Sequence, residues 1–106
     1  MKNTLILQFK TTGGVTDYDR LIVLENALVQ GYEQNHSGIV DGHDMGEGNM
    51  NIFIFPTKAW GPCIEIAIAY LRHKNMLEEA IIIKRLKSEK YKVVWPLDFS
   101  GEFVRL

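Results

Sequence analysis

The segment 41–48, with the sequence DGHDMGEG, gathers three acidic residues, a histidine and three glycines. Side chains alternate between the two faces of an extended segment, so Asp41 and His43 would share one face while Asp44 points to the other. Two ligands on one strand, joined by Glu47 from the following turn, could start a site for a divalent metal. The residue types therefore raise metal binding as the first hypothesis.

The spacing of the remaining residues argues against such a site. Zinc normally takes three or four protein ligands, and the other histidines, His36 and His73, have no motif spacing relative to the segment. The segment also lacks the lysine and the serine or threonine of a phosphate loop, and it leads into a strand instead of a helix. We interpret it as a hairpin turn in which Gly46 and Gly48 adopt positive φ. We therefore assign no metal-binding, cofactor-binding or catalytic residue.

A turn on a rigid scaffold often carries recognition, and this turn is acidic. Ion binding by the turn stays open as the alternative. We predict that the turn contacts a protein partner through four side chains, Asp41, His43, Asp44 and Glu47.

A second candidate for chemistry is the run AWGPCIEIAIAYL, which follows the extended run NIFIF. It resembles the redox segment of thioredoxin-like proteins, in which a strand, WCGPC and a helix follow in that order. Cys63 would lie in the first turn of a helix, where the helix dipole lowers a thiol pKa. The first cysteine is absent, because Gly61 follows Trp60 directly, and one thiol cannot carry out dithiol exchange. We interpret Cys63 as a buried or half-buried small apolar residue.

Basic residues cluster around Tyr91 in the C-terminal part of the chain. Basic loops on a sheet with aromatic residues are a feature of RNA-recognition modules. The run NIFIFP, however, lacks the glycines and the basic residue of their consensus strand, and the net charge of −1 argues against a dedicated nucleic-acid binder. Charges at sheet edges typically solvate the edge, so nucleic-acid binding is disfavoured. The cluster comprises Lys84, Arg85, Lys87, Lys90 and Lys92.

The composition fits an ordinary folded domain. The chain has 106 residues, 46% of them hydrophobic and 24% charged, which is enough for one domain, residues 1–106, with its own core. Its single cysteine excludes an internal disulfide and fits a reducing cytosol. The apolar run near the N-terminus is too short for a signal peptide or a membrane span. We expect a soluble, cytoplasmic protein that does not bind membranes.

Apolar spacing and turn residues predict the order β-α-β-β-α-β followed by one more strand. This is the split βαβ pattern of a ferredoxin-like fold, an α+β sandwich whose antiparallel sheet carries two helices on one face. Gly31 is expected to stop the first helix, and the extra strand to extend the sheet beside AIIIK. The elements are a strand at 4–10, a helix at 17–30, strands at 38–44 and 51–55, a helix at 60–74, and strands in EEAIIIKRL and YKVVWP.

Three of the expected strands are apolar on both faces, in the runs 5–7, 52–55 and 81–83. A sheet covered by helices on one face should instead alternate apolar and polar residues. The face opposite the helices is therefore expected to be apolar, and monomers rarely leave such a patch in water. Burial by a second chain is favoured, and a homodimer through this face is one form that it could take. The alternative is that the C-terminal tail, with Phe99 and Phe103, folds over the face.

The runs 37–55 (SGIVDGHDMGEGNMNIFIF) and 93–99 (VVWPLDF) resemble a hairpin and a tail found in small, largely uncharacterised bacterial proteins. Those proteins share the pattern DG[HN][DE]-x-G followed by an alternating extended strand, and the resemblance covers the last two thirds of the chain. The group has no established catalytic residues, so none is carried over. In size, fold pattern and composition the chain is also similar to immunity proteins of bacterial toxin systems, including contact-dependent inhibition.

The absence of a catalytic constellation, together with the apolar second face of the sheet and the acidic turn, favours a non-catalytic protein-binding domain. By analogy with those immunity proteins, we expect an immunity protein that binds and neutralises a cognate bacterial toxin. A toxin that cleaves RNA or DNA must present a basic cleft, which the acidic turn would complement. Two alternatives stay open. One is a small metal- or thiol-dependent enzyme that uses Asp41, His43 or Cys63, and the other is a ligand-binding ferredoxin-like domain.

Overall fold

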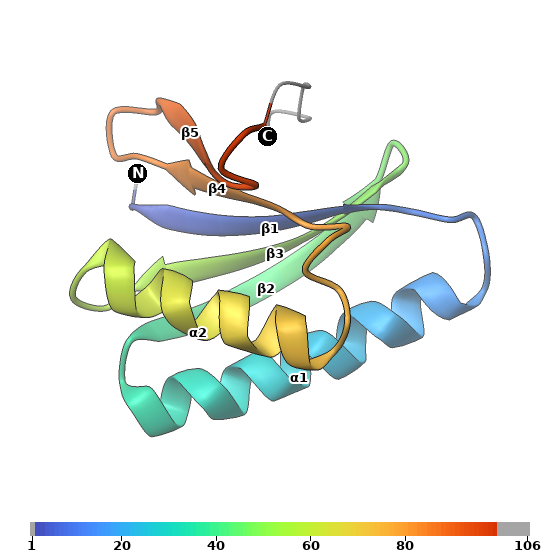
Figure 1. The fold of residues 1–106 in the computed structure, drawn as a ribbon, viewed down its shortest axis with the longest axis horizontal. Coiled ribbons are helices and arrows are strands. Elements are labelled where there is room, and N and C mark those ends of the chain that lie inside the picture. Colours follow the sequence, from blue (N-terminus) through green and yellow to red (C-terminus); the bar gives the residue numbers. More distant parts are fainter. Residues whose placement is uncertain (1, 100–106) are drawn as a thin grey trace.

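The computed structural model describes residues 2–99, which form five strands and two helices (Figure 1). In this part of the chain neither helix is long and apolar enough to cross a membrane. In chain order the elements are β1 (Thr4–Lys10), α1 (Thr16–Asn35), β2 (Gly38–Gly46), β3 (Asn49–Pro56), α2 (Trp60–His73), β4 (Ile81–Arg85) and β5 (Tyr91–Trp95).

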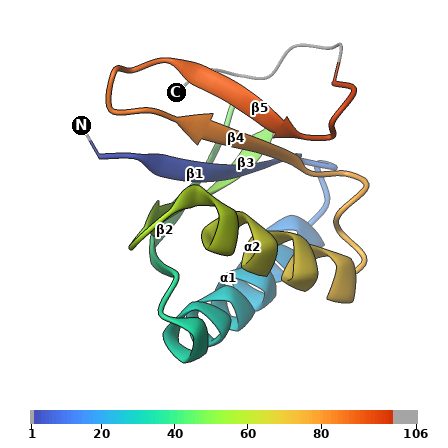
Figure 2. The ribbon, with the colours of Figure 1, turned by 60° about the vertical axis from the view of Figure 1, so that its left-hand side comes forward.

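The five strands form one sheet in the order β2-β3-β1-β4-β5, and every neighbouring pair is antiparallel. β3 therefore lies between β2 and β1, and β1 lies between β3 and β4. Both helices pack on the same face of the sheet (Figures 1 and 2). The predicted α+β class, the antiparallel sheet with two helices on one face and the extra strand beside β4 are confirmed.

The core lies between the helices and the sheet. Apolar residues of α1 recur every three or four positions, which gives the helix one buried stripe. The strands contribute every second residue, because alternate side chains point to the helices. The fully buried side chains of this layer include Leu5, Leu7, Phe9, Leu21, Leu24, Leu28, Met50, Ile52, Ile54, Cys63, Ala67 and Leu71.

The prediction that Gly31 stops the first helix is wrong, because α1 continues to Asn35. Gly31 lies within the helix and is buried against Tyr70 of α2. A Cβ atom at this position would lie 2.5 Å from Cζ of Tyr70. The glycine therefore leaves room for the ring of Tyr70 against α1. The helix is closed instead by His36, which adopts a left-handed conformation with φ 52°.

The face of the sheet opposite the helices is apolar, as the sequence predicts. Ile6 of β1 and Ile83 of β4 are only 0% and 1% exposed. Cationic groups lie over the aromatic rings beside them, with Arg85 Cζ 5.9 Å from the ring centroid of Phe53. That a second chain covers this face stays a prediction. Phe103, invoked for the alternative, lies outside the described residues.

We predict that Gly31→Ala destabilises the protein by about 1 kcal/mol, because overpacking typically costs about 1–3 kcal/mol and exceeds the helix-propensity gain of about 1 kcal/mol. Denaturant unfolding measures the effect. In a Tyr70→Ala background the same substitution has open space and is expected to stabilise the helix. If Gly31→Ala stabilises the protein with Tyr70 in place, this contact does not constrain the helix packing.

Candidate functional site

A β-bulge interrupts β2 at the start of the acidic segment. Val40 pairs with Ile54, but the next paired residue is Gly42, which faces Phe53, so Asp41 is an extra residue in the strand. Asp41 is exposed. Side chains do not alternate regularly between the two faces across a bulge. The strand pairing therefore gives no support to the prediction that Asp41 and His43 share one face.

His43 points toward the helices and binds Glu25 of α1. Its Nδ1 lies 3.0 Å from both carboxylate oxygens of Glu25. Because an ionised carboxylate only accepts hydrogen bonds, Nδ1 is the donor. The ring of Tyr18 meets that of His43 edge to face, with centroids 5.9 Å apart. The side chains of His43 and Glu25 are 27% and 14% exposed, so this pair joins α1 to β2 near the surface.

Asp44 points to the opposite face, as the sequence predicts, and has a structural partner there. Its Oδ1 accepts a hydrogen bond of 2.8 Å from Nδ2 of Asn51. Oδ1 of Asn51 in turn accepts one of 3.0 Å from Nε2 of Gln8. Asn51 and Gln8 are 3% and 2% exposed, so their amides require partners inside the protein. Asp44 is thus the exposed end of a polar row that crosses β2, β3 and β1.

Glu47 and Gly48 form the two-residue turn between β2 and β3. Their φ angles of 52° and 82° are those of a type I′ hairpin turn. The prediction that Gly46 supplies a positive φ is therefore wrong, and Glu47 adopts it instead. This conformation is uncommon for a residue that is not glycine, asparagine or aspartate. The N–H of Thr11, just after β1, donates to the carbonyl of Gly48 and ties the turn to the sheet.

The four residues predicted to bind a partner do not form one site. His43 and Asp44 lie on opposite faces of the sheet, while Asp41 and Glu47 are exposed at the bulge and the turn. Within residues 2–99, no group of three or more histidine, cysteine, aspartate or glutamate residues could hold a metal ion. Partner binding by these four residues stays a prediction.

Cys63 is a buried residue of α2, which confirms its interpretation as a small core side chain. Its Sγ donates to Oη of Tyr32 at 3.6 Å, and that hydroxyl donates to the carbonyl of Cys63 at 2.7 Å. Burial raises the pKa of the Cys63 thiol, and the hydrogen bond to Tyr32 offsets only part of this effect. The thiol is therefore protonated at neutral pH and is a poor nucleophile.

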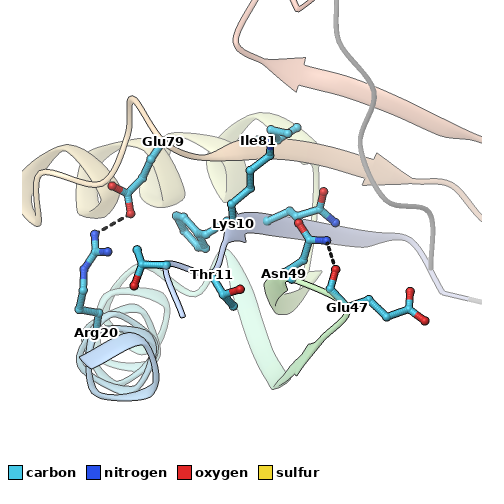
Figure 3. Close-up of a pocket in the computed structure, with 11 residues that line it drawn as sticks. Lys10, Thr11, Arg20, Glu47, Asn49, Glu79 and Ile81 are labelled. Carbon is cyan, nitrogen blue, oxygen red and sulfur yellow. Dashed lines mark hydrogen bonds and ion pairs between the residues drawn. The ribbon is translucent and has the colours of Figure 1, made fainter. Parts of the chain in front are cut away.

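A cleft of about 690 Å³ opens at the end of the sheet where β1 finishes and β3 and β4 begin (Figure 3). Arg20 of α1 and Glu79 before β4 point toward one another on one side and form an ion pair with an N–O distance of 2.5 Å. Lys10 and Glu47 provide one more charge of each sign. Sequence reasoning missed this cleft, because Arg20 and Glu79 are far apart in the chain and no motif connects them.

The glycine-containing loop between β1 and α1 is already occupied by a carboxylate of the chain. The N–H groups of Thr12 and Gly13 donate to Oδ2 of Asp17 at 3.0 and 3.1 Å, and the Thr12 hydroxyl donates to Oδ1 at 2.7 Å. A phosphate group at a helix N-terminus would need such N–H groups. The loop therefore serves to start α1, with Asp17 in the first turn.

Acidic and basic side chains lie on different parts of the sheet, although the net charge of the chain is only −1. Between residues 11 and 57 the only lysine or arginine is Arg20, which pairs with Glu79. β2 and the basic β4–β5 hairpin lie toward opposite edges of the sheet. The acidic side chains of this stretch are Asp17, Asp19, Glu25, Glu33, Asp41, Asp44 and Glu47.

Exposed apolar side chains lie on the same acidic side of the molecule. Tyr18 of α1 is 52% exposed, and Met45 of β2 is 41% exposed. Tyr18, Glu25 and Val29 have the spacing that puts residues on one face of a helix, and Glu25 places this face beside His43. We call this surface the α1–β2 flank, and define it by Tyr18, Glu25, Val29, Asp41, His43, Met45 and Glu47.

Comparison of the chain with protein-family models, with curated proteins and with solved structures finds no match.

We predict that Asp17→Asn lowers the midpoint of urea unfolding at neutral pH. Hydrogen bonds from the Thr12 hydroxyl, and then from the backbone of Thr12 and Gly13, hold the pKa of Asp17 below its ordinary value of 3.8, although burial acts in the opposite direction. A lowered folded-state pKa stabilises the protein above the unfolded pKa, and this contribution is lost as pH falls through the folded pKa. The difference from wild type should thus shrink in acid.

The exposed Asp19, changed to asparagine, is the control: it removes a charge from the first turn of α1 without removing the hydrogen bonds of Thr12 and Gly13, and should lower the midpoint less. A deficit of Asp17→Asn that stays constant from neutral pH into acid would contradict the role of the charge.

We predict that Glu47→Asn stabilises the protein by about 0.5–1 kcal/mol, because asparagine tolerates positive φ in a type I′ turn better than glutamate. Thermal unfolding measures the change. Glu47→Gln removes the same charge without introducing a residue that tolerates positive φ, and it should stabilise less. Equal stabilisation by both variants would show that charge repulsion, and not the backbone of Glu47, is relieved.

Proposed function

We propose that this chain is a non-catalytic protein-binding domain, an immunity protein that binds and neutralises a cognate bacterial toxin in the cytoplasm. The observation that carries the proposal is the α1–β2 flank, where exposed aromatic and apolar side chains lie within an acidic surface. Aromatic residues and methionine are enriched in the centres of protein interfaces, and Tyr18 and Met45 supply both.

The proposed partner is a nuclease toxin, because its cleft must attract a polyanion. A basic cleft is complementary to the acidic flank, and such complementarity speeds association and rejects other partners. The exposed carboxylates of Asp41 and Glu47 are suited to this role, since neither accepts a hydrogen bond from a buried side chain within the described residues. Cys63 supports a non-catalytic function, because its thiol is buried and protonated.

The proposal includes a ferredoxin-like core with β5 appended. Its support is the split arrangement, in which β3 separates β2 from β1, and β1 separates β3 from β4. The fold alone does not specify function, so the assignment depends on the surface.

A second candidate is a domain that binds a small ligand in the cleft at the end of the sheet. Its cations, Lys10 and Arg20, and its carboxylates, Glu47 and Glu79, are equal in number. That balance favours a zwitterionic ligand over a simple anion or cation. The ion pair of Arg20 with Glu79 already satisfies two of these charges, which makes this candidate the weaker one.

The test of the proposed function is co-expression with the protein encoded immediately upstream of this chain's gene. We expect a stable complex and loss of the toxicity that the upstream protein shows alone. Asp41→Lys with Glu47→Lys should weaken the complex about tenfold or more, because like charges would then meet. Asp44 is left unchanged, because Asn51 depends on it.

The matched control is Glu65→Lys with Glu78→Lys, which makes the same charge change at exposed residues outside the α1–β2 flank. Exposed charges contribute only about 0–1 kcal/mol per pair, so both double variants should keep nearly the wild-type melting temperature. An upstream protein that does not bind, or that binds both double variants equally well, would contradict the proposal.

A further inference from the structure

We propose that the α1–β2 flank binds its partner by strand addition, in which an extended cationic segment of the partner pairs with the outer edge of β2. This inference rests on the proposed function. It identifies β2 as the element that binds the partner and a cationic, extended segment as the part of the partner that is bound. It makes β2, and not the Glu47–Gly48 turn, the centre of the interface.

The sheet leaves β2 at its edge. Within residues 2–99, β2 pairs only with β3, so its other side offers backbone N–H and C=O groups to a further strand. β2 spans nine residues and is the longest of the five described strands. Addition of a partner strand to such an edge is a common mode of peptide recognition.

β2 has few of the features that normally protect an edge. Its sequence, GIVDGHDMG, contains neither lysine nor proline, which are typical blockers. β5, at the opposite edge, contains Lys92 and is followed directly by Pro96. The bulge at Asp41 and the acidic side chains are its protective features, and beyond the bulge Gly42 to Gly46 pair with β3 in continuous register. We propose that the partner strand pairs with this regular part of β2.

The two faces of β2 define the side chains that an added strand should carry. Asp44 is exposed on the face opposite the helices, so a lysine or arginine of the added strand would oppose it. His43 and Met45 point to the other face, beside Tyr18, and would receive an apolar side chain. The segment is therefore one in which basic and apolar residues alternate.

A second copy of this chain is a poor occupant for this edge. Antiparallel pairing of the regular part of β2 with its own copy, centred on Asp44, would set Asp44 opposite Asp44 and Asp41 opposite Glu47. Like charges opposite one another on paired strands are destabilising. Charge complementarity therefore favours a cationic segment of a different protein.

The experiment uses the full chain and a capped peptide of alternating lysine and valine, as long as β2, as the probe. We expect backbone amide shifts to concentrate in residues 42–46 and their hydrogen exchange to slow. A peptide with the same sequence but N-methylated on alternate residues, prepared in both registers, keeps the charge and loses pairing donors. The peptide whose methyl groups replace the N–H groups facing β2 should bind at least about tenfold more weakly than the one methylated in the other register, and a peptide with glutamate in place of lysine should also bind more weakly.

Met45→Lys should weaken binding of the lysine–valine peptide, whereas Leu97→Lys, at another highly exposed apolar residue, should not. Equal binding of both N-methylated peptides would show charge attraction without strand pairing and would overturn the inference. Absence of binding by the lysine–valine peptide, or shifts confined to the Glu47–Gly48 turn, would overturn it as well.

Hydrogen exchange in the complex with the upstream protein separates this inference from the proposed function. If the complex forms and residues 42–46 exchange as fast as in the free chain, strand addition is wrong and the proposed function stands. If the lysine–valine peptide binds as expected and the upstream protein does not bind, the proposed function is wrong and the edge remains a strand-binding site.

Discussion

The pairing of β1 with β3 on one side and with β4 on the other is the constraint on which the rest of the fold depends. Every residue from Thr4 to Phe9 is buried, so β1 contributes to both faces of the sheet at once. Because β1 occupies the centre, β2 and the β4–β5 hairpin must lie toward opposite edges. The acidic stretch of the chain is thereby separated from the basic hairpin by the width of the sheet. The surface available to a partner is thus a consequence of strand order.

The register of the central strands is specified by polar contacts within an otherwise apolar face. Gln8, Asn51 and Asp44 lie opposite one another on β1, β3 and β2, and each is hydrogen-bonded to the next. A shift of one residue in either pairing would bury an amide without its partner, which costs about 1–3 kcal/mol. It would also move the apolar side chains of a strand to the other face. Asp44 therefore belongs to the scaffold, although its sequence context is that of a binding loop.

The sequence predicts the elements well where periodicity and turn residues act locally, and less well where distant residues meet. Alternation and helical spacing predict all five strands and both helices, because these patterns reflect burial on one face. From the local sequence Gly31 is expected to end the helix, because its contact with Tyr70 depends on the tertiary fold. Likewise, nothing near His43 in the sequence indicates Glu25, and the bulge at Asp41 depends on how β2 pairs with β3. The positions of the side chains at the site depend on tertiary contacts, which a local sequence pattern does not predict.

The net charge of −1 argued against nucleic acid as a partner, but it does not describe the local charge that a protein partner would meet. Screening at physiological ionic strength limits surface electrostatics to about 8 Å, so a partner experiences the local charge of one edge more than the sum over the chain. The edge strand β2 and the outward side of α1 present carboxylates and exposed apolar groups together, while Arg20 is held by Glu79. The Glu25–His43 pair joins these two elements. A partner would thus meet an acidic surface already assembled before binding, which reduces the ordering cost of association.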